Sequence, residues 1–200
     1  MVAVQQAVRA KSRLSADVPS PLREALVVAM LDDVLMSVRT AHAGLVVVVS
    51  ADPAYDTVAG AHGAEVLRDA GTGYRAAAAY ALDRLAGRVR AALILPGDIP
   101  QLHSEDVAAA IAEVETPGVL LVPLQDGGTA ALGLHPLDAI APAFGPDSAA
   151  LHRAAAAAAR VRFVEARYPS MRTDVDTRAD LDAIRANAGP ATRVILDQLP

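Results

Sequence analysis

Two hundred residues are enough for one compact domain with a full hydrophobic core, and two independent domains would be cramped. A net charge of −5 argues against general binding to nucleic acid, whose phosphates select basic surfaces. The chain has no cysteine, which excludes disulfides, thiolate metal sites and cysteine nucleophiles.

The sequence also argues against a secreted or membrane-bound protein. The first nine residues lack the basic start and the long apolar stretch of a signal peptide. The most apolar run, Leu45–Val49, is far too short to span a bilayer. We therefore expect a cytoplasmic protein with no membrane partner.

Short apolar runs alternate along the chain with alanine-rich stretches. Leu45–Ser50, Ala91–Leu95 and Val119–Pro123 are apolar almost throughout and predict strands that are buried on both faces. Weaker strand patterns occur at Val2–Val4, Ala64–Leu67, Ala130–Leu134 and Val161–Glu165.

The helical stretches carry recognisable ends. Ser20 and Ser104 can each cap the helix that follows, the first with Pro21 in its opening turn. Thr177 followed by Asp180 resembles a capping box. The stretches that we expect to be helical are one that begins after Ser20, then Ala76–Leu85, Glu105–Val114, Ala149–Ala159 and Leu181–Ala188.

This alternation predicts a single α/β domain with a mostly parallel sheet, right-handed connections and helices on both faces. We place the domain at residues 1–188. Residues 189–200 form a tail, which is either a short final helix or an arm for a possible homodimer.

Acidic side chains follow the predicted strands, where ligands bind in open α/β sheets. Asp98 comes shortly after the strand that ends at Leu95. Asp174 and Asp176 are two residues apart, so in an extended chain they share one face. The three carboxylates offer the hard oxygen ligands that Mg²⁺ prefers, and we predict a magnesium site. For Asp174 and Asp176 the alternative is that they only favour the N-terminus of the next helix.

Two cations, Lys11 and Arg13, lie on the loop that leaves the first predicted strand. They suit a triphosphate, whose charge must be neutralised as pyrophosphate departs. A solvated basic patch would have the same spacing.

Two glycine-bearing loops, Asp126–Thr129 and Phe144–Ser148, place hydroxyl groups beside flexible backbone. Such loops can cradle a small phosphorylated acid, although ordinary turns have the same composition. His135 and His152 are isolated in the sequence, and we assign a role to neither.

Taken in order, several segments resemble one family, the 2-phospho-L-lactate or phosphoenolpyruvate guanylyltransferases of coenzyme F420 biosynthesis. The resemblance runs from about Val2 to Ile184, nearly the whole chain. FGPDS followed by DVDT is fairly specific, whereas LPGDIP is shared with many nucleotidyltransferases. The segments that carry the resemblance are Ala10–Leu14, Ala29–Val34, Leu95–Pro100, Asp126–Thr129, Phe144–Ser148 and Asp174–Thr177.

The resemblance implies a single-domain nucleotidyltransferase fold of the GT-A or molybdopterin-guanylyltransferase type. The implied reaction transfers GMP from GTP to phosphoenolpyruvate or 2-phospho-L-lactate and releases pyrophosphate. The implied metal ligands are Asp98, Asp174 and Asp176. The implied contacts to the phosphorylated three-carbon acid are Thr129, Gly145 and Ser148. The implied nucleotide contacts are Lys11, Arg13, Gly73, Arg75 and Pro96, and the implied catalytic residues are Asp98, Lys11 and Arg13.

The chain departs from the family's pattern at three positions. Gln5 stands where the family usually has a lysine, and Arg75 stands where it has an asparagine. Ala130 follows Thr129 where many relatives have an asparagine. Other interpretations therefore stay open. A plain structural α/β domain is the weakest of them, because it would not need aspartates at the ends of separate strands. Two more remain. One is a nucleotidyltransferase with a different base or acceptor, and the other is a non-catalytic protein that binds nucleotide.

Overall fold

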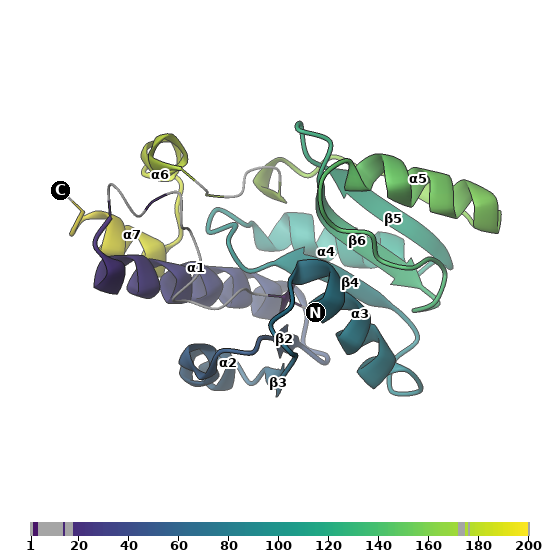
Figure 1. Ribbon diagram of the computed structural model, residues 1–200, viewed down its shortest axis with the longest axis horizontal. Helices are drawn as coiled ribbons and strands as arrows, with labels where there is room; N and C mark the ends of the chain where they lie inside the picture. The colour runs from purple at the N-terminus through teal and green to yellow at the C-terminus, as the bar shows by residue number, and fades with distance from the viewer. Residues whose placement is uncertain (1, 4–13, 15–17, 172–174, 176, 200) are drawn as a thin grey trace.

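The computed structural model describes residues 2–3, 14, 18–171, 175 and 177–199 of the chain. Within these residues seven strands form one sheet, in the order β3-β2-β1-β4-β6-β5-β7 (Figure 1). The strands are β1 (Val2–Ala3), β2 (Val47–Val49), β3 (Glu65–Leu67), β4 (Ala92–Pro96), β5 (Gly118–Pro123), β6 (Thr129–His135) and β7 (Phe163–Glu165).

The sheet is mostly parallel, as predicted, with β6 as its antiparallel strand. β1 is parallel to β2 and β4, β2 is parallel to β3, and β5 is parallel to β7. β6 is antiparallel to both of its neighbours, β4 and β5. Since β6 separates two strands that point the same way, the loops after β4, β5 and β7 and the start of β6 all lie at one edge of the sheet.

Helices cover both faces of the sheet (Figure 1). Within β4, Leu93 and Leu95 belong to the cluster that packs against α1 and α4. The alternating neighbours Ala92 and Ile94 pack with α3 and α5 on the other face. Both faces of β4 are therefore buried, which explains its unbroken apolar sequence. The helices are α1 (Ser20–Ala41), α2 (Asp56–Ala61), α3 (Tyr74–Leu85), α4 (Ser104–Val114), α5 (Ser148–Ala159), α6 (Arg178–Ile184) and α7 (Pro190–Leu196).

Gly133 in β6 lets α4 lie close against the sheet. A Cβ atom at this position would lie 2.3 Å from Cγ2 of Val114 and 2.9 Å from Cβ of Leu120. Both distances are below van der Waals contact, so any larger residue would push the helix or the neighbouring strand away.

The predicted helix caps are confirmed at α6 and wrong at α1 and α4. At α6 the Thr177 hydroxyl accepts from the Asp180 N–H at 3.3 Å, and Asp180 Oδ2 accepts from the Thr177 N–H at 2.7 Å. Ser20 and Ser104 are instead the first residues of their helices, and the residues before them make no side-chain cap. The chain enters each of these two helices one residue earlier than the serine pattern indicates.

The sequence did not predict the short helix α2, whereas the short helix α7 was one of the two alternatives for residues 189–200. α2 has six residues, too few for helical periodicity to be visible in the sequence. α7 packs against α1, where the buried carboxylate of Asp33 accepts from the N–H groups of Ala191 at 3.0 Å and Thr192 at 2.8 Å. Burial raises the pKa of Asp33, and the hydrogen bonds from Thr192 and Ala191 oppose that shift. Asp33 thus caps the last helix from the first.

Candidate active site

Asp98 lies two residues after β4, at the edge of the sheet where the connecting loops gather. It is half-buried, whereas Ile99 beside it is only 1% exposed and anchors the turn in the core. Pro96, the last residue of β4, pairs with Ala3 of β1. The chain therefore leaves β1 at the same edge at which it presents Asp98.

Two tyrosines from neighbouring loops lie within electrostatic reach of Asp98. Tyr55 follows β2 and Tyr74 follows β3. Burial is the main cause that raises the pKa of each phenol. The charges of Asp52 and then Asp98 raise the pKa of Tyr55 further, and the charge of Asp98 raises that of Tyr74. The Tyr74 hydroxyl is buried and makes no hydrogen bond within the described part of the chain. The loops after β2, β3 and β4 thus converge on one carboxylate.

Four predicted residues lie outside the described residues: Lys11, Arg13, Asp174 and Asp176. Gln5 is also outside them. Among the residues that are described, no group of three acidic or histidine side chains lies close enough to hold a metal. The predicted magnesium site therefore stays a prediction.

The segment that carries Asp174 and Asp176 is anchored on both sides by described residues. Before it, Asp106 of α4 accepts from the Ser170 hydroxyl at 2.7 Å and from the Ser170 N–H at 3.0 Å. Within it, Val175 is 0% exposed, and after it comes the Thr177 cap of α6. The chain thus enters the segment from a residue that is bonded to α4 and continues after it into the cap of α6.

The structure brings together Thr129 and Ser148, two of the residues that the resemblance assigns to the phosphorylated acid. Thr129 begins β6 and Ser148 begins α5, and their hydroxyl oxygens are 2.9 Å apart. Gly145 lies three residues before Ser148 and accepts from its N–H at 3.2 Å. Gly145 has a φ of 135°, and a Cβ there would meet no atom within 4 Å, so the glycine is needed for its backbone conformation. The three residues form a partly buried polar cluster, and we name it the acceptor pocket after the role that the resemblance implies for it.

His152 contacts the acceptor pocket, although no pattern in the sequence indicates a role for it. Its Nδ1 is 3.0 Å from Oγ1 of Thr129, and its Nε2 accepts from the Ala143 N–H at 2.8 Å. The ring is 0% exposed, and burial lowers its pKa from 6.5 to about 4. The available signal was the spacing of four residues from Ser148, which puts both side chains on one face of α5. His135, by contrast, bonds the Val114 carbonyl at the opposite edge of the sheet.

Aromatic rings connect the acceptor pocket to α3. The Phe144 ring packs edge-on against Tyr74, with ring centroids 4.6 Å apart, and against His152, with centroids 5.4 Å apart. Tyr74, the first residue of α3, lies between Gly73 and Arg75, which are both predicted nucleotide contacts. The start of α3 is therefore next to the acceptor pocket.

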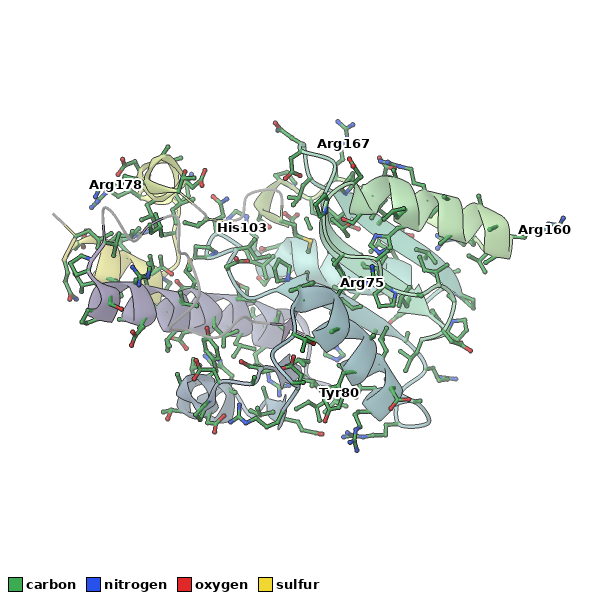
Figure 2. The ribbon with its side chains drawn as sticks, viewed as in Figure 1. Arg75, Tyr80, His103, Arg160, Arg167 and Arg178 are labelled. Atoms are coloured by element: carbon green, nitrogen blue, oxygen red, sulfur yellow. The ribbon has the colours of Figure 1, made fainter. Side chains whose placement is uncertain are left out.

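Arg75 is exposed on the first turn of α3 (Figure 2). It makes no salt bridge with any residue that the structure describes. A cation at a helix N-terminus is opposed by the helix dipole, so this position favours an anionic ligand as its partner. Gly73, the residue that precedes the helix, has a φ of 118°.

The structure adds one observation on membranes. None of the helices in the described part of the chain combines the length and the apolar composition that crossing a bilayer requires.

The sequence of the chain matches one protein family. A family model described as guanylyl transferase CofC like matches residues 1–192. The phosphoenolpyruvate guanylyltransferase of Sphaerobacter thermophilus is 35% identical over 191 residues, covering 94% of this chain and 92% of the relative. That of Conexibacter woesei is 38% identical over 203 residues, covering 95% and 91%.

Solved structures share the fold at low sequence identity. A putative nucleotide-diphospho-sugar transferase from Desulfovibrio desulfuricans aligns with a TM-score of 0.78 at 15% identity, over 98% of this chain and 96% of its own. A nucleotidyl transferase from Methanothermobacter thermautotrophicus aligns with a TM-score of 0.64 at 15% identity, over 98% and 97%. These similarities confirm the predicted nucleotidyltransferase fold.

Proposed function

Because the chain belongs to the family of CofC-like guanylyl transferases, we propose that it transfers GMP from GTP to phosphoenolpyruvate and releases pyrophosphate, as a step of coenzyme F420 biosynthesis. The match over residues 1–192 carries this proposal, since it spans both the Asp98 loop and the acceptor pocket. Both substrates are metabolites of the cytoplasm, where we place the enzyme.

The reaction needs one bond to form and one to break. A phosphate oxygen of phosphoenolpyruvate attacks the α-phosphorus of GTP, and the bond from that phosphorus to the oxygen shared with the β-phosphate breaks. The products are enolpyruvyl-diphospho-guanosine and pyrophosphate. The attacking phosphate is already ionised, so the protein needs no general base. This agrees with His152, whose two ring nitrogens are both engaged by other groups.

The acceptor pocket is the part of the chain that we assign to the phosphorylated acid. Thr129 and Ser148 offer hydroxyl groups, and Gly145 keeps the loop before α5 in its positive-φ conformation. We assign Gly73, Arg75 and Pro96 to the nucleotide. The packing of Tyr74 on Phe144 supports these assignments, because it holds the two groups of residues side by side.

We further propose that Asp98 binds Mg²⁺ together with Asp174 and Asp176, and that Lys11 and Arg13 stabilise the departing pyrophosphate. Asp98 fits a hard cation, because it is a half-buried carboxylate whose negative charge also reaches two buried phenols. When bound, the ion would offset the negative charge of the reacting phosphates.

Pyrophosphate release tests the proposal. The protein is incubated with Mg²⁺, each of the four nucleoside triphosphates in turn, and phosphoenolpyruvate, 2-phospho-L-lactate or 3-phosphoglycerate. We expect the highest kcat/KM for GTP with phosphoenolpyruvate. Equal or higher kcat/KM with ATP or CTP would overturn the choice of base, and a preference for another acid would overturn the choice of acceptor. No release with any pair would overturn the catalytic function and favour a protein that only binds nucleotide.

A further inference from the structure

His152 is a buried histidine whose two nitrogens have different, fixed roles. Nε2 lies 2.8 Å from the Ala143 nitrogen, which can only donate, so Nε2 must be the unprotonated nitrogen. A neutral imidazole then carries its proton on Nδ1. Nδ1 is therefore the donor in the 3.0 Å contact with Oγ1 of Thr129.

This tautomer determines what the acceptor pocket can offer a ligand. Oγ1 of Thr129 accepts from His152 and lies 2.9 Å from the Ser148 hydroxyl. The two hydroxyl groups have two protons, and the bond between them uses one. When Ser148 donates, both lone pairs of Thr129 are occupied and its own proton has no partner in the pair. Thr129 is the half-buried member and Ser148 is 1% exposed, so the spare donor lies on the more accessible group.

We propose that His152 is a positioning residue for the acceptor substrate, because its bond to Thr129 leaves the Thr129–Ser148 pair with a hydroxyl proton to donate to an anionic oxygen of the phosphorylated acid. The inference rests on the proposed function. It also explains why the acceptor substrate is a phosphorylated acid. A phosphate or carboxylate oxygen only accepts hydrogen bonds, and a saturated Thr129 oxygen can only donate one.

The surroundings of His152 keep it in this state. The Phe144 ring packs on it edge-on, and Tyr74 packs on Phe144 in turn, which keeps water away from the imidazole. Burial alone lowers its pKa to about 4, with no charged group among the causes. A charged imidazole would also point an N–H at the Ala143 N–H. His152 thus holds a hydroxyl in place and moves no proton.

Two substitutions separate the roles of the two nitrogens. The amide nitrogen of His152→Asn can take the place of Nδ1 and still donate to Thr129, whereas His152→Gln can reach Ala143 but loses the donor at the Nδ1 position. Each variant keeps one of two hydrogen bonds, so we expect similar melting temperatures. His135→Gln, at the opposite edge of the sheet, is the control.

Calorimetry with Mg²⁺ and a non-hydrolysable GTP analogue present measures the dissociation constant of phosphoenolpyruvate. Steady-state kinetics measures KM for both substrates. For His152→Gln we expect both the dissociation constant and KM of phosphoenolpyruvate to rise about tenfold, because Thr129 loses the donor that keeps its proton directed at the ligand and its hydrogen bond to the anion weakens. For His152→Asn we expect a rise of less than about threefold. KM for GTP stays within about twofold in both.

Each result of these measurements either supports or overturns the role proposed for His152. Equal weakening in the Asn and Gln variants would show a purely structural role, and wild-type affinity in the Gln variant would also overturn the proposal. Nitrogen chemical shifts of the unaltered protein that place the proton on Nε2 would overturn it without any variant. If phosphoenolpyruvate binds with the expected ranking but no pyrophosphate forms, the proposed function fails and the role of His152 stands. If the unaltered protein does not bind phosphoenolpyruvate, both fail.

Discussion

The acceptor pocket and the Asp98 side of the site differ in how exposed their polar groups are. In the acceptor pocket Thr129 bonds to both Ser148 and His152, and these two are almost completely buried. On the other side Asp98 is half-exposed and Arg75 is exposed at a helix N-terminus. Hydrogen bonds among its own residues organise the first region, whereas the second carries a partly exposed carboxylate and an exposed guanidinium, which suit the charged ligands that we propose for it.

Because of this difference, substitutions in the two regions should affect stability and activity differently. In the acceptor pocket, removing one group leaves a buried partner unsatisfied, so substrate affinity and stability should fall together. Around Asp98, the loss of a partly solvated charge should reduce activity and leave the fold intact. Four predictions test this separation.

Asp98→Asn should have the largest effect. The variant keeps the size of the side chain and removes its charge, so we expect kcat to fall by about 10³-fold with a melting temperature within about 2 °C of the unaltered protein. Pyrophosphate release and calorimetric unfolding measure the two quantities. Asp138→Asn, an exposed carboxylate that follows β6 at the opposite edge, is the matched control and should retain full activity. A drop in rate of less than tenfold would remove Asp98 from the site.

Acid should destabilise the acceptor pocket through His152. The pKa of His152 is about 4 in the folded protein and near 6.5 when unfolded, so the unfolded chain binds more protons between these values. The free energy of unfolding should therefore fall as the pH drops from 6.5 to 4, by roughly 3 kcal/mol in total. Denaturant unfolding of the unaltered protein and of His152→Asn at several pH values isolates this contribution. Parallel pH curves for the two proteins would contradict it.

Thr129→Val should affect both stability and binding. Valine has nearly the same shape but leaves the buried His152 Nδ1–H without an acceptor, which costs about 1–3 kcal/mol of stability. We expect KM for phosphoenolpyruvate to rise about tenfold while KM for GTP stays constant. Steady-state kinetics and chemical denaturation check the pair of effects. A rise in KM with unchanged stability would show that the hydrogen bond from His152 to Thr129 contributes little to the free energy of unfolding.

Arg75→Ala should have the smallest effect and concern the nucleotide alone. Loss of an exposed cation near the triphosphate or base should raise KM for GTP about threefold to fivefold. Stability should stay constant or rise by a few tenths of a kcal/mol, since the helix dipole opposes a cation at this end. KM measured at low and at high salt tests this. A change in KM for phosphoenolpyruvate instead would move Arg75 to the acceptor side.

Much of the fold could be predicted from the sequence. The apolar runs at Ala91–Leu95 and Val119–Pro123 form β4 and β5 to within a residue at each end, because a strand buried on both faces must be apolar throughout. The Thr177–Asp180 capping box was visible because both partners lie within one turn of chain. The positions of Thr129 and Ser148 followed from the resemblance of their loops to one family.

Other features depend on contacts between distant segments. Nothing in the run Ala130–Leu134 shows that β6 is antiparallel, because strand direction is set by its neighbours. The cap that Asp33 provides to α7 joins residues more than 150 positions apart.

The sequence by itself determined the α/β class, the placement of Asp98 after a buried strand and the family, because each follows from local pattern or from ordered motifs. Only the tertiary structure decided the role of His152. In the sequence it is a lone histidine on an alanine-rich helix, and its chemistry arises from Thr129 and Ala143, which lie on other segments. Burial fixes its protonation, and burial is a property of the packed molecule.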